Sequence, residues 1–88
     1  MTSDPAFPDW WNWELSFTGH AELRMEQRGV SEVDVRAMLE RPTRHEPSVV
    51  EGRFTIHVVH QRHPWIVIVE PDREANLLIV VTAYEVPQ

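Results

Sequence analysis

The chain of 88 residues contains no cysteine. Neither a disulfide framework nor a thiolate metal site can therefore help to hold the fold. Long apolar runs are also missing, because the longest span about five residues whereas a membrane-spanning helix needs about 18 or more. The acidic start, with Asp4 and Asp9, does not resemble a signal peptide. These absences predict a soluble, cytoplasmic protein that does not enter a membrane.

Lysine is absent too, so arginine, with eight residues, supplies all the permanently charged basic side chains. Arginine suits bidentate contacts with phosphate, but a GC-rich coding bias would give the same usage. The net charge of −6 counts against generic nucleic-acid binding, which normally needs a basic surface. The composition therefore leaves room only for a local basic site.

The length predicts one domain. Residues 1–11 combine two prolines with two acids and no hydrophobic period, and we expect a mobile N-terminal arm there, followed by a single domain over residues 12–88. Trp10 and Trp11 have no place in a first strand. They either fold over an open apolar face of the domain or anchor an interface.

Two helices are well marked. The first begins after Thr18, a good N-cap, and ends at Gly29, which can adopt the left-handed conformation of a helix C-terminus. The second begins with the capping-box pattern of Ser31 and Asp34 and ends near residue 41, before a proline. Val30 lies between the helices, where we expect it to pack against both.

Period-two and continuous β-branched patterns fill the rest of the chain. The expected strands cover residues 12–17, 48–51, 53–60, 65–69 and 77–81. The order β-α-α-β-β-β-β predicts an α+β fold, with two helices packed on a mostly antiparallel sheet of four to five strands. The two last strands lack alternation, which is typical of strands covered on both faces. Since two helices cover one face, the other must meet the arm, a partner or water.

The first expected helix contains the main candidate catalytic residues. His20, Arg24 and Arg28 are four residues apart and lie on one side of it, separated by roughly 40° at each step. The positive end of the helix disfavours an imidazolium at His20, so a neutral ring could accept a proton as a general base. The two guanidiniums could hold a phosphate, which is a workable arrangement for metal-free RNA cleavage. The alternative is that the arginines pair with sheet acids such as Glu70 or Glu85, and that His20 only caps the helix.

Other patterns give weaker signals. His57 and His60 look like metal ligands, but residues three apart on a strand face opposite ways. No glycine-rich phosphate loop and no nucleophile elbow are present. The sequence therefore predicts neither a metal nor a cofactor.

Motifs over nearly the whole chain, from about residue 13 to residue 86, resemble a family of small bacterial domains allied with the RelE/ParE-type toxins. They are His20-Ala21-x-x-Arg24-Met25-x-x-Arg28-Gly29-Val30-Ser31-x-x-Asp34-Val35 and Thr82-Ala83-Tyr84. The resemblance implies a RelE-like fold and an active site formed by His20, Arg24 and Arg28 with Thr82 or Tyr84.

Two hypotheses follow. The first is a RelE/ParE-like toxin domain that acts as a ribonuclease on an RNA substrate and has a cognate antitoxin. RelE-type enzymes that cut messenger RNA on the ribosome are strongly basic, whereas this chain is acidic, so we expect action on free RNA. The second is a non-catalytic module that binds a protein or forms a homodimer through the tryptophan-rich arm and the open face of the sheet.

Overall fold

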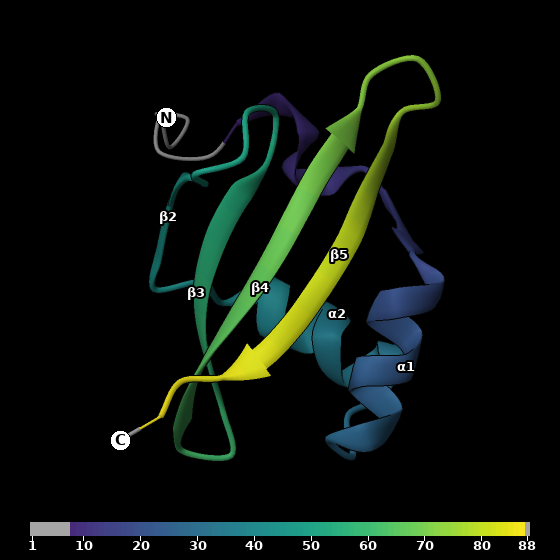
Figure 1. Cartoon of the computed structure of the whole chain (residues 1–88). Helices are drawn as coiled ribbons and strands as arrows, with labels where there is room; N and C mark the ends of the chain where they lie inside the picture. The colour runs from purple at the N-terminus through teal and green to yellow at the C-terminus, as the bar shows by residue number, and fades with distance from the viewer. Residues whose placement is uncertain (1–7, 88) are drawn as a thin grey trace.

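Two helices pack on one face of a five-stranded sheet in the computed structural model, which describes residues 8–87 (Figure 1). The elements in chain order are the 3-10 helix η1 (Asp9–Asn12), β1 (Glu14–Phe17), α1 (Gly19–Gln27), α2 (Glu32–Glu40), β2 (Arg44–Pro47), β3 (Phe54–His60), β4 (His63–Asp72) and β5 (Leu77–Glu85). After η1, the order of helices and strands is the predicted one. Among the described residues, no helix is both long and apolar enough to span a bilayer.

The strands lie in the order β1-β5-β4-β3-β2. The pairings β5–β4, β4–β3 and β3–β2 are antiparallel, and β1 pairs in parallel with β5. The predicted α+β class and the mostly antiparallel sheet are thus confirmed, with five strands. Both helices lie behind the sheet in Figure 1, and the face toward the viewer carries no helix.

The helix ends follow their sequence signals. The Ala21 N–H donates to Thr18 Oγ1 over 2.9 Å at the start of α1, and Ser31 and Asp34 form a complete capping box at the start of α2. Gly29 has φ +71°, and the Val30 N–H donates to the Met25 carbonyl over 2.9 Å. These bonds form a Schellman motif, which sets the sharp turn between the two helices.

Trp10 belongs to the core. Its side chain is only 1% exposed, and its ring centroid lies 4.9 Å from that of Phe54. Phe54 pairs with the buried Val69, so Trp10 covers the helix-bearing side of the sheet. Residues 9–11 thus lie in η1, with Trp10 packed on the domain, because burying the indole outweighs the cost of ordering this short segment. Residues 1–7 lie outside the described part of the chain.

The first strand begins at Glu14, later than the predicted residue 12. Trp13, Leu15 and Phe17 alternate along the chain and pack, partly buried, against the core. The core itself takes residues from both helices and the sheet: Ala21, Met25, Val30, Val35, Met38, Leu39, Ile56, Val58, Trp65, Val67, Val69, Leu78, Val80 and Ala83, with Trp10.

The strand expected at residues 48–51 is misplaced. The structure forms β2 from Arg44–Pro47 instead, and residues 49–52 form the turn into β3. A polar edge strand such as β2 carries almost no hydrophobic signal, because neither of its faces is deeply buried. The gap expected between the strands 53–60 and 65–69 is a tight hairpin in which Gln61 and Arg62 both have positive φ. Strand β4 already begins at His63.

Val30 gives a test of the helical hairpin. Its side chain is 6% exposed, within the core that also contains Met25 of α1 and Val35 of α2. We expect Val30→Ala to lower the free energy of unfolding by about 1–2 kcal/mol. Urea denaturation measures the loss, and Val33→Ala, at a valine that is 73% exposed, is the control. A loss within about 0.5 kcal/mol would show that Val30 does not join the two helices.

Candidate functional site

Hydrogen bonds attach the N-terminus of α1 to β5 at the point where the pairing of β5 with β1 ends. The pairing with β1 ends at Val80, and β5 continues to Glu85. The Thr18 N–H donates to the Val80 carbonyl over 3.2 Å, and Thr18 Oγ1 donates to the Val81 carbonyl over 3.3 Å. Val81 is the extra residue of a β-bulge, because Val69 pairs with Val80 while Ile68 pairs with Thr82. The first turn of α1 therefore lies at this bulge.

The C-terminus of α1 is fastened to the same strand. Arg28 Nη1 donates to the Ala83 carbonyl over 3.1 Å. Arg28 thereby satisfies a carbonyl that lies beyond the pairing with β1. Of the three residues His20, Arg24 and Arg28, Arg28 is thereby held against the free part of β5.

The side chains of His20 and Arg24 differ in their exposure and in their hydrogen bonds. His20 is exposed in the first turn, and Arg24 is partly buried, with Nη1 donating to Gln27 Oε1 over 3.2 Å. The acids expected as alternative partners of the arginines are engaged elsewhere. Glu70 pairs with Arg53 at 2.9 Å, and Glu85 lies 3.2 Å from His63.

The strand register places the two candidates on β5, Thr82 and Tyr84. Tyr84 and Arg28 line a common open pocket of about 440 Å³, together with Trp65, Glu85 and Pro87. Thr82 pairs with Ile68, on the face of the sheet that carries no helix. Tyr84 pairs with Ile66 and so shares that face, which places the Thr82 and Tyr84 side chains across the sheet from α1, although Tyr84 also lines the pocket with Arg28 at the edge of β5.

A cluster that the sequence did not reveal lies on β2 and β3. His57 Nε2 is 2.9 Å from Glu46 Oε2, and Arg44 Nη2 is 3.4 Å from the same oxygen. An ionised carboxylate can only accept, so Nε2–H of His57 donates to Glu46. The hydrogen bond from His57 is the main cause that holds the pKa of Glu46 below its ordinary value of 4.5. The cluster depends on the position of β2, which no periodic pattern indicated.

Glu46 should make stability depend on pH. Its pKa is lowered in the folded state, so its contribution is fully present above about pH 4.5 and is lost as the pH falls through the lowered value. We expect wild type to be more stable than Glu46→Gln above pH 4.5, with the difference shrinking below it. Urea denaturation between about pH 7 and pH 3 measures this, with Glu51→Gln as an exposed control. A difference that is constant over this range would contradict the assignment.

The two histidines that suggested a metal site diverge as the strand geometry predicts. His57 pairs with Ile66 and contacts Glu46, whereas His60 packs edge-on against Trp65 with ring centroids 5.7 Å apart. Because Trp65 is buried on the helix side, the two imidazoles lie on opposite faces of β3.

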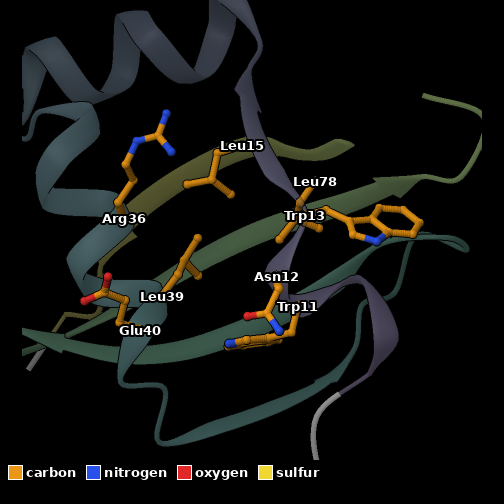
Figure 2. A pocket seen from close by; sticks show the side chains of 8 residues that line it. All are labelled: Trp11, Asn12, Trp13, Leu15, Arg36, Leu39, Glu40 and Leu78. Atoms are coloured by element: carbon orange, nitrogen blue, oxygen red, sulfur yellow. The ribbon is translucent and has the colours of Figure 1, made fainter. Parts of the chain in front are cut away.

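A second hollow, of about 400 Å³, lies between α2 and the chain around β1 (Figure 2). Figure 2 shows Trp11, Leu15 and Leu39 around it, with the Trp13 indole pointing away from Leu39. The guanidinium of Arg73 lies 5.9 Å from the centroid of the Trp13 ring. Of the two tryptophans that the sequence left without a place, Trp10 is buried, and Trp11 packs beside it with the two ring centroids 5.7 Å apart.

The chain belongs to a family of domains of unknown function, DUF4258, whose model matches residues 17–85. This range begins at the last residue of β1 and includes both helices and strands β2–β5. Comparisons with curated proteins and with solved structures give no match.

Proposed function

We propose that this chain is an RNA-cleaving domain of the RelE/ParE toxin type, with its active site between α1 and the free part of β5. The attachment of α1 to β5 at both of its ends, through Thr18 and Arg28, carries the proposal. It holds an exposed imidazole and two guanidiniums in a row beside a strand with a β-bulge. Bulges are common next to active sites, where they re-aim side chains.

The residues divide the reaction between them. His20 accepts the proton of an RNA 2′-hydroxyl, whose oxygen then attacks the adjacent phosphorus. Arg24 binds the phosphate and stabilises the charge that develops on it. Water supplies a proton to the departing 5′-oxygen, and the proton taken up by His20 then returns to the solvent. The products are a 2′,3′-cyclic phosphate and a free 5′-hydroxyl, so protons and bonds balance.

Thr82 and Tyr84 are left out of this site, because their side chains share the helix-free face with Ile68 and Ile66. Arg28 has two roles, since its bond to the Ala83 carbonyl also supports the edge of β5. Arg24 is therefore the better probe of phosphate binding.

Growth of cells that express the chain tests the proposal. Expression of wild type should slow growth, and His20→Ala should restore it at equal protein level. Co-expression of an adjacent antitoxin gene should also restore growth. Equal growth inhibition by both proteins, or none by either, would favour the alternative, a non-catalytic protein-binding or dimerisation module. The specific support for that alternative is the helix-free face of the sheet.

A further inference from the structure

The helix-free face of the sheet is unusually apolar along its centre. Antiparallel sheets with one solvated face normally alternate apolar and polar residues, and β3 follows this rule on the open face at Thr55 and His57 but not at Val59, which is 54% exposed. The central strands β4 and β5 do not. Ile66, Ile68 and Ile79 lie on the open face, and each is only partly buried.

Charged side chains flank this apolar stripe on the side of β2 and β3 and at the end of β4, and they are paired within the chain. Arg53 and Glu70 form one ion pair at 2.9 Å, and Glu46 contacts both Arg44 and His57. The register places these groups on the same face, because Arg44 pairs with His57 and Glu70 pairs with Ile79. An apolar centre with a polar rim is the usual anatomy of a protein interface.

We infer that this face binds a second copy of the chain, so that two sheets pack face to face about a two-fold axis. These ion pairs are each made of opposite charges, so they do not favour an oppositely charged partner. A self-complementary surface of this kind fits an isologous interface, in which the same residues meet from both sides. The inference does not depend on the proposed function.

The size of the face fits a modest dimer. Five strands at about 4.8 Å spacing, over about seven residues each, give a face of roughly 24 by 23 Å. Two such faces bury roughly 1,100 Å² together, which is just above the approximately 1,000 Å² expected of a specific interface.

The acidic charge of the chain does not oppose this arrangement strongly. Glu22, Glu26, Glu32 and Glu40 lie on the helices, on the other side of the sheet. In a face-to-face dimer these helices are on the outside, separated by two sheet layers about 10 Å apart and by the domains themselves. That separation exceeds the Debye length of about 8 Å at physiological salt.

Sedimentation velocity on purified chains tests the inference across a series from about 1 µM to about 200 µM. Wild type should sediment as a dimer within this range. Ile68→Glu places a charge near the two-fold axis in both subunits and should raise the dissociation constant by about 100-fold or more. The matched control is Leu23→Glu, at a leucine of α1 that is 51% exposed on the helix side, and it should dimerise like wild type.

Folding is checked separately by circular dichroism and thermal melting. If Ile68→Glu does not fold, Ile68→Thr serves instead, because threonine keeps the β-branched shape and should still weaken the dimer measurably. A wild type that remains monomeric throughout the series would overturn the inference. So would equal dimerisation of wild type and the folded Ile68 variants. RNA cleavage plays no part in either result.

Discussion

His20→Ala is expected to slow cleavage of free RNA by about 10²–10⁴-fold while leaving the fold intact, because it removes the general base. His20 is exposed and lies two residues after the N-cap, so its removal creates no cavity in the core. The rate constant on a short single-stranded RNA measures the effect, and the urea denaturation midpoint checks the fold.

Arg24→Ala should weaken both RNA binding and turnover, since in the proposed mechanism Arg24 contacts the phosphate in the ground state and in the transition state. Its control is Arg36→Ala, which removes an equal charge from an exposed position on α2. Equal losses in the two arginine variants would mean that net charge alone governs RNA binding. Full activity of His20→Ala would contradict the role of His20.

Trp10→Ala is expected to lower the free energy of unfolding by about 3–5 kcal/mol. The indole is 1% exposed and contacts Phe54 at the end of the sheet, so truncation leaves a large cavity. A domain of this size has a total stability of about 5–15 kcal/mol, and the variant should therefore melt far below wild type. Urea denaturation gives the difference directly.

The control is Trp11→Ala, because Trp11 is a neighbouring tryptophan that remains partly exposed. It should cost distinctly less than Trp10→Ala. Equal small losses in both variants would show that η1 does not belong to the core. Equal large losses would place Trp11 in the core beside Trp10.

The sequence predicted those features of the fold that local signals control. Thr18, Gly29, Ser31 and Asp34 specify the helix ends through hydrogen bonds within a few residues, and all four act as predicted. Trp10 was not placed, because its burial depends on contact with Phe54, which lies 44 residues further along the chain.

The candidate site could be predicted only in part for a similar reason. A regular strand β5 would place Thr82 on the same face as Val80, toward the helices. The bulge at Val81 reverses this alternation, so that Ala83 faces the core and Thr82 faces away. No pattern in the run from Leu77 to Val81 signals the bulge. The polar strand β2 was likewise missed, and with it the cluster around His57.

The proposed chemistry requires the 2′-hydroxyl of the nucleotide at the cleavage point, and this requirement gives the most direct test. Purified wild type is incubated, in the presence of EDTA, with an RNA and with the same RNA carrying one 2′-deoxy nucleotide at the mapped cleavage point. The proposed mechanism predicts that the unmodified RNA is cleaved to a 2′,3′-cyclic phosphate and that the RNA with the 2′-deoxy nucleotide is not cleaved at that position. Equal cleavage of the two substrates, or no cleavage of RNA by the folded protein, would contradict it.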